Sequence, residues 1–167
     1  PALPLLVRRK VPDVAIGAAG GALGVAGLAA IPFWSAGAAT VLLFVAMVIL
    51  SAGSLLGWLR GEDDHAAWQE RGLEILGVAG VLGIGLVQSL IVQTGTAGVL
   101  AVVGVAVTIL ARRIPAVRPP WAASPATAPV LLAPFALGGT STIGLALIAL
   151  HAGATLAHAI EMLRREV

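Results

Sequence analysis

The chain has 167 residues, of which 59 % are hydrophobic and only 11 % are Asp, Glu, Lys or Arg, and its mean hydropathy is +1.01. Charged residues make up about a quarter of a typical soluble domain, so this composition excludes a soluble globular enzyme. It also excludes a disordered chain, which would be poor in hydrophobic residues and rich in charge. We therefore expect an all-α, polytopic integral membrane protein that forms one transmembrane helical domain over residues 1–167.

The net charge of +2 does not indicate a nucleic-acid partner. The ten basic residues stand in small groups between long apolar stretches, and they form no basic stripe with interleaved aromatic residues. The chain has no Cys, which excludes a disulfide framework, a thiolate metal site and a cysteine nucleophile. The lipid bilayer is the first partner that the sequence implies.

Three long apolar stretches follow one another along the chain. No ionisable residue occurs over 14–59 or 75–111, and only two histidines occur over 119–160. A helix needs about 20 apolar residues to cross the hydrocarbon core, and each stretch is interrupted by Pro, Gly or polar residues that favour a turn, near Pro32, Thr94 and Gly139. The sequence thus predicts three helical hairpins, 13–59, 73–112 and 122–162. The six predicted crossings are 13–31, 36–59, 73–93, 96–112, 122–138 and 141–162.

Two polar connections separate these hairpins. We expect a cytoplasmic loop over 60–72, in which Asp63 or Asp64 caps a short helix, and a Pro-rich connector over 114–129. The acidic residues and His65 of the loop favour a solvated segment over a cation site. Trp58, Trp68 and Trp121 are expected at the cytoplasmic interface, and Trp34 at the outer one.

The fifth predicted crossing is the weakest, because it contains Pro125, Pro129 and Pro134. Irregular backbone is tolerated at membrane depth when protein shields it. The alternative is therefore five crossings with a re-entrant or broken Pro-rich segment in place of 122–138.

The charge distribution supports six crossings. All ten basic residues then fall on one side, and the positive-inside rule makes that side cytoplasmic, with both termini inside. Arg outnumbers Lys nine to one in a chain rich in Ala and Gly, which favours a GC-rich prokaryotic genome. We expect a prokaryotic cytoplasmic-type membrane, or a membrane derived from it.

Small residues recur at helical spacing in the first and last crossings. Membrane helices associate through close approach at such residues, so these positions are predicted to pack against other helices of the chain. Oligomerisation or docking to another subunit is the alternative. The predicted packing residues are Gly17, Gly20, Gly21, Gly24 and Gly27 in the first crossing, and Ala149, Gly153 and Ala157 in the last.

A polar stripe is predicted on the last crossing, where His151 lies at mid-membrane. An intramembrane ionisable residue points to function by default, and the helical period places Thr155 and His158 on its face, with Glu161 at the edge. One interpretation is a neutral imidazole hydrogen-bonded to a carbonyl or to a side chain such as Gln88 or Ser89. The other is a proton path, a permeation route or a cofactor ligand.

No cofactor or metal is expected. The two histidines of the stripe share one helix, so a single chain cannot present them as opposed haem ligands, and no nucleotide-hydrolysis, zinc-protease or nucleophile-elbow motif occurs. The leading hypothesis is a non-enzymatic structural subunit that packs against other membrane subunits or further copies of itself. Its assembly would be a respiratory or transport complex or the membrane layer of an enveloped particle. The alternative is a small oligomeric transporter or channel that uses the stripe around His151.

Overall fold

A computed structural model describes residues 13–33, 36–61, 63–93, 95–114, 121–124 and 128–166. Every secondary-structure element in these ranges is a helix, which confirms the all-α prediction. Four helices, α3, α4, α5 and α7, are long and apolar enough to cross a membrane, as a multi-pass membrane protein requires. The helices are α2 (Asp13–Ala30), α3 (Ala36–Arg60), α4 (Asp63–Val92), α5 (Thr96–Arg113), α6 (Ala128–Leu137) and α7 (Ser141–Glu166).

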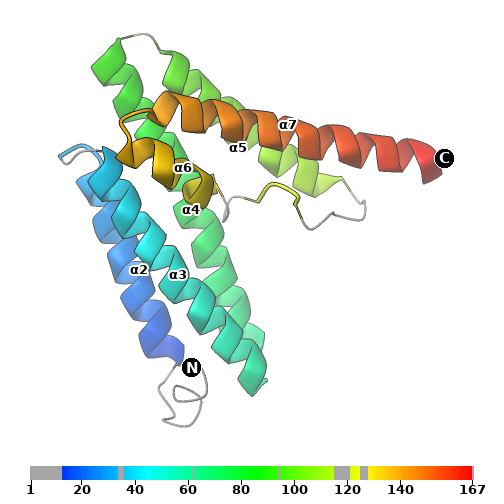
Figure 1. Cartoon of the computed structure of the whole chain (residues 1–167). Coiled ribbons are helices and arrows are strands. Elements are labelled where there is room, and N and C mark those ends of the chain that lie inside the picture. The colour runs from blue at the N-terminus through cyan, green and yellow to red at the C-terminus, as the bar shows by residue number, and fades with distance from the viewer. Residues whose placement is uncertain are drawn as a thin grey trace.

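The helices form two groups (Figure 1). Helices α2, α3 and α4 pack along one another as a bundle, and α5 and α7 lie side by side and lead away from it at an angle, with α6 between the two groups. Helices α3, α5 and α7 all begin at the end of the molecule where the α4–α5 turn lies and run away from it. Each of these three helices ends in a turn that carries arginine.

Leucine side chains of α3 and α4 fill the centre of the bundle. Leu43 and Leu50 of α3 are fully buried, and they pack with Leu76 and Val81 of α4. The core continues through Leu132 of α6 into the α5–α7 pair. One continuous apolar interior therefore joins the two groups of helices.

The contact between α5 and α7 follows small residues. The buried positions of α5 recur every three or four residues, and a Cβ on Gly104 would lie 3.2 Å from the Ile148 side chain and 3.4 Å from the backbone nitrogen of Ala149. Such spacing lets two membrane helices approach closely. The buried positions are Ala97, Ala101, Gly104, Thr108 and Ala111 on α5, and Leu145, Ile148, Ala152, Thr155 and Ala159 on α7.

The structure corrects the loop predicted over 60–72. Helix α3 extends to Arg60, Gly61 turns the chain with a φ of 74°, and α4 begins at Asp63. Asp64, Trp68, Glu70 and Arg71 are exposed on the outer face of α4, whereas its inner face buries Ala66, Gln69 and Leu73. The side chains of Asp63 and His65 lie outside the described residues, as does Trp34.

The predicted helix over 122–138 is also corrected. Residues 122–124 are not helical, and α6 has only 10 residues, which rise about 15 Å against a hydrocarbon core about 30 Å thick. The prolines of this segment lack the N–H groups that a continuous helix uses. The described part of the segment lies along α7 as an irregular stretch, 121–124, and a short helix, α6 (Figure 1), so the prediction of a continuous helix over 122–138 is wrong.

Candidate functional site

The polar stripe of α7 faces the irregular stretch that precedes α6. The Trp121 ring lies edge-on to two imidazoles, with centroids 6.3 Å from His151 and 5.5 Å from His158 and interplanar angles of 61° and 63°. Both histidines are half-buried. The tryptophan thus bridges two turns of α7, and the histidines serve as its aromatic neighbours.

Thr155 connects the same two segments through its hydroxyl group. The backbone N–H of Ala123 donates a 2.8 Å hydrogen bond to the Thr155 Oγ1, and this hydroxyl donates a 3.0 Å bond to the carbonyl oxygen of His151. Both Ala123 and Thr155 are buried. A buried backbone N–H left unpaired costs about 1–3 kcal/mol, and the Thr155 hydroxyl satisfies one that lies outside any helix.

Two other residues assigned to the stripe lie apart from this cluster. Glu161 is exposed and pairs with Arg165 one turn later. Gln88 is half-buried on α4, and among the described residues no hydrogen bond joins it to His151. The Ser89 hydroxyl is used locally, because it donates to the Gly85 carbonyl oxygen at 2.9 Å and accepts from the Gly98 N–H at 2.6 Å.

The glycines of α2 divide into four that face other helices and one that does not. A Cβ on Gly17 would lie 2.9 Å from Gln69 Nε2, one on Gly20 would lie 2.8 Å from Leu50 Cγ, and one on Gly27 would lie 3.1 Å from Leu43 Cγ. A Cβ on Gly24 would overlap the Leu76 side chain, whereas Gly21 has open space around it. The inward positions therefore follow the heptad spacing of a close helix seam, and Gly21 lies outside it.

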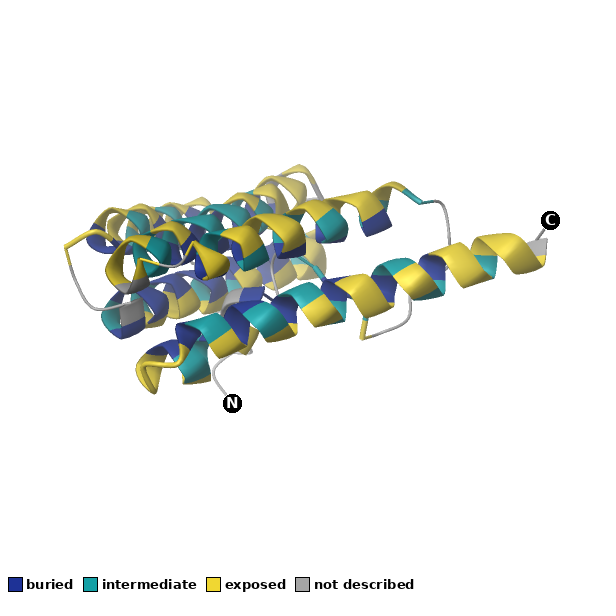
Figure 2. Cartoon of the chain, turned by 90° about the horizontal axis from the view of Figure 1, so that it is seen from above, coloured by how far each residue is buried: buried dark blue, intermediate teal, exposed yellow. Residues whose placement is uncertain are grey.

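The small residues predicted on α7 are mostly uncovered. Ala149 packs its backbone against Gly104 of α5, but Gly153 and Ala157 are exposed, and nothing lies within 4 Å of a Cβ built on Gly153. Figure 2 shows the exposed side of α7 along its C-terminal half. Among the described residues, none covers the side of α7 that carries Gly153 and Ala157.

Gln69 is a buried polar residue that the sequence analysis missed. Its side chain is 1 % exposed in the centre of the α2–α3–α4 bundle, where it lies between Gly17 of α2 and Gly53 of α3. The two glycines leave the volume that the carboxamide fills. The helical period could have predicted this burial, since Gln69 falls on the same face of α4 as the apolar residues Ala66, Leu73 and Leu76.

The polar side chains described above make their contacts within the chain. In the described part of the chain, no group of three or more His, Asp or Glu side chains comes together as a metal site. The α7 cluster holds an irregular segment against a membrane helix, and Gln69 fits a gap between glycines. Comparisons of the chain with known protein families, with curated proteins and with solved structures find no match.

Proposed function

We propose that this chain is a non-enzymatic, multi-pass membrane protein that acts as a structural subunit of a larger membrane assembly. The assembly would be a respiratory or transport complex or the membrane layer of an enveloped particle, in a prokaryotic cytoplasmic-type membrane or one derived from it. The observation that carries the proposal is the exposed outer face of the α5–α7 pair.

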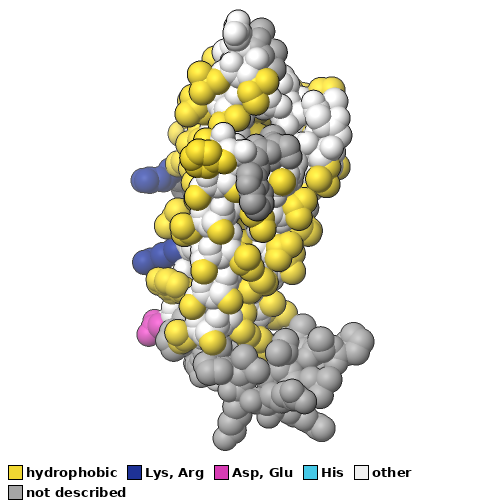
Figure 3. Space-filling view, turned by 90° about the vertical axis from the view of Figure 1, so that its left-hand side faces the viewer, with side chains coloured by type: hydrophobic (Ala, Val, Ile, Leu, Met, Phe, Trp, Pro, Cys, Tyr) yellow, Lys and Arg dark blue, Asp and Glu magenta, His cyan; other side chains and the backbone are white. Residues whose placement is uncertain are grey.

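This face is too apolar for water and is little covered by the chain. Only 28 % of the apolar window of α5 and 33 % of that of α7 are buried, and Val99 and Leu150 are more than 60 % exposed. Figure 3 shows, on another side of the molecule, many hydrophobic side chains among white backbone, and the charged side chains that are coloured there lie at the edge of the view. Lipid covers such surfaces, and neighbouring membrane helices dock where side chains are small.

The proposed docking face is the exposed small-residue side of α7, at Gly153, Ala154 and Ala157. These residues lie on a helix that extends beyond the others (Figure 2). A partner helix can approach the α7 backbone closely at these three positions, because their side chains are no larger than a methyl group, and the exposed Leu150 and Ile160 flank them on the same face.

The α7 cluster supports a structural role over transport. The stripe of His151, Thr155 and His158 contacts Trp121 and Ala123 of the same chain. A permeation route would require these groups to face water, whereas here they hold the broken segment in place.

We place the arginine-bearing ends of α3, α5 and α7 on the cytoplasmic side. The chain would cross six times, with α2 as the first crossing and the irregular stretch plus α6 as a broken fifth. From Ser141 to Thr155, the part of α7 along which this segment returns, the helix rises about 21 Å. Arg8, Arg9, Lys10 and Arg118, which the charge argument also uses, lie outside the described residues.

The test compares two glycine variants in the assembly extracted in mild detergent from the native membrane. Gly153→Leu and Gly21→Leu both place a leucine in open space on a helix surface, so both chains should fold alike. We expect Gly153→Leu to reduce the fraction of the chain in the high-mass species on native gels at least fivefold, and Gly21→Leu to leave it unchanged.

Two results would contradict the proposal. One is a wild-type chain that migrates as a detergent-bound monomer under all mild extraction conditions. The other is an equal effect of the two variants, which would place the contact elsewhere. A flux of ions or small solutes through vesicles that contain the purified chain would favour the transporter hypothesis.

A further inference from the structure

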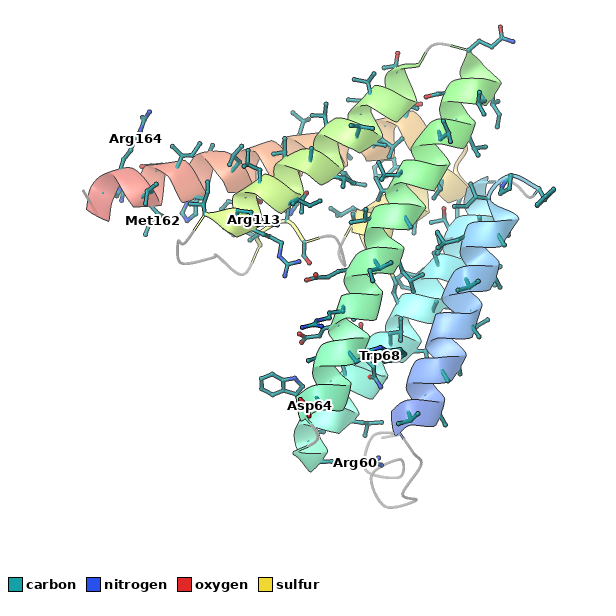
Figure 4. All side chains as sticks on the ribbon, turned by 180° about the vertical axis from the view of Figure 1, so that it is seen from behind. Arg60, Asp64, Trp68, Arg113, Met162 and Arg164 are labelled. Atoms are coloured by element: carbon teal, nitrogen blue, oxygen red, sulfur yellow. The ribbon has the colours of Figure 1, made fainter. Side chains whose placement is uncertain are left out.

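A wedge-shaped groove opens between α4 and α5. Near their connecting turn the two helices touch, since a Cβ on Gly85 would lie 3.0 Å from the Ala97 carbonyl oxygen, and the Gly98 N–H reaches Ser89 Oγ at 2.6 Å. Toward the C-terminal end of α5 the helices diverge (Figure 4). The groove is therefore closed at one end and open at the other.

At the open end only long side chains span the gap. Arg112 of α5 forms an ion pair with Glu74 of α4, and both side chains are about one-third exposed. The groove between this pair and the closed end has a volume of about 590 Å³. Its lining residues are Glu74, Ile75, Val78, Ala79 and Leu82 of α4, and Ile109, Arg112 and Arg113 of α5.

Charge and apolar surface are separated within the groove. The three ionic groups lie at the mouth, and the walls beyond them are entirely aliphatic. Arg112 is balanced by Glu74, but Arg113 is exposed and has no acidic partner among the described residues. The mouth therefore carries one excess positive charge, next to an apolar wall that runs about 10 Å along α4 from Ile75 to Leu82.

We propose that this groove binds an anionic phospholipid, with the headgroup phosphate at Arg112 and Arg113 and one acyl chain along the wall formed by Val78, Ala79 and Leu82. Basic pockets between membrane helices are suited to anionic headgroups. The proposed membrane placement puts the two arginines at the cytoplasmic interface, where headgroups lie.

Width and charge favour a lipid over a protein helix. The groove closes toward the α4–α5 turn, and a single acyl chain is much thinner than a helix with its side chains, which is about 10–12 Å wide. The phosphate of an anionic lipid also supplies the negative charge at the mouth that an apolar helix lacks.

The test titrates the purified, delipidated full chain with two lipids of identical acyl chains, phosphatidylglycerol and phosphatidylcholine, and counts bound lipids by native mass spectrometry. We expect phosphatidylglycerol to bind at least fivefold more tightly. Arg113→Gln should lower its affinity about fivefold, as one basic group at a membrane surface implies. The matched control Arg164→Gln removes the same charge from the exposed end of α7 and should change nothing.

A second pair of variants tests the apolar wall. Ala79→Phe fills the groove and should reduce binding of both lipids, whereas Ala22→Phe adds the same ring to an exposed position of α2 and should leave both affinities unchanged. If Ala79→Phe lowers the helix content by circular dichroism, the surface variant Arg113→Gln decides the question alone.

Three results would overturn the proposal. These are equal loss of phosphatidylglycerol binding in Arg113→Gln and Arg164→Gln, unchanged binding in a folded Ala79→Phe chain, and displacement of the lipid by millimolar inorganic phosphate. The last would identify a phosphate site rather than a lipid site. Lipid binding is measured on the isolated chain, so its failure leaves the proposed subunit role unaffected.

Discussion

The hydroxyl of Thr155 accepts a hydrogen bond from the backbone N–H of Ala123, 32 residues earlier in the chain. The same hydroxyl donates to the His151 carbonyl oxygen, so one side chain joins a regular helix to an irregular segment. This bond explains how a Pro-interrupted stretch can lie against a membrane helix without an unsatisfied donor at that position.

Replacement of Thr155 by Val should release this contact. Valine keeps the shape of threonine but cannot accept the Ala123 N–H, and a buried donor left unpaired costs about 1–2 kcal/mol in this setting. Unfolding in mixed micelles, followed by circular dichroism, should show this loss for Thr155→Val and much less for Thr155→Ser, which keeps the hydroxyl. Equal stability of Thr155→Val and the wild type would show that water or another group satisfies Ala123.

The glycine face of α2 gives a matched pair of variants. Gly24→Leu should destabilise the bundle by about 1–3 kcal/mol, because the new side chain overlaps Leu76, which is only 6 % exposed. Gly21→Leu adds the same atoms in open space and should be neutral or slightly stabilising, since leucine favours a helix over glycine. The difference between the two free energies of unfolding is the measurement, and no difference would contradict the helix packing described here.

Membrane topology can be probed by labelling of introduced cysteines, since the chain has none of its own. Glu70→Cys and Thr140→Cys both place the thiol at an exposed position, in α4 and in the turn before α7. The proposed topology puts Glu70 near the cytoplasmic side and Thr140 on the opposite side. An impermeant maleimide should therefore label them from different sides of sealed vesicles, and labelling from the same side would refute it.

The Gln69 site predicts a variant that a second substitution rescues. A Cβ at position 53 would overlap the Gln69 Oε1. The carboxamide cannot easily move away, because Gly17 lies close to its other side. Gly53→Ala should cost about 1–3 kcal/mol of unfolding free energy. In a chain that already carries Gln69→Ala, the same Gly53→Ala change should lower the unfolding free energy by less than it does in the wild type. Strictly additive effects would mean that the two residues do not interact.

Apolar length was sufficient to predict the long helices. Helices α3, α5 and α7 begin and end within a few residues of the predicted crossings, because arginines and turn residues mark their ends. The start of α4 was predicted wrongly. Its first turns are polar on the outside, and the burial of Ala66 and Gln69 in the three-helix bundle makes them part of the core.

The fifth segment and the α7 cluster depend on contacts that no local pattern contains. The helical period correctly places His151, Thr155 and His158 on one face, but it does not reveal that Trp121 packs against the two histidines. The pairing of Ala123 with Thr155 is a long-range bond, and its partners carry no shared motif. For the same reason, the sequence alone could not show that Gly24 faces another helix whereas Gly21 faces open space.

The bond between Ala123 and Thr155 also bears on the order of events during synthesis. When the broken fifth segment leaves the ribosome, the residue that satisfies its backbone has not yet been made, because Thr155 follows Ala123 by 32 residues. On the proposed topology, the Ala123 N–H would meet hydrocarbon without its partner until α7 has been made. We therefore expect the stretch before α6 and α7 to enter the membrane together rather than one after the other.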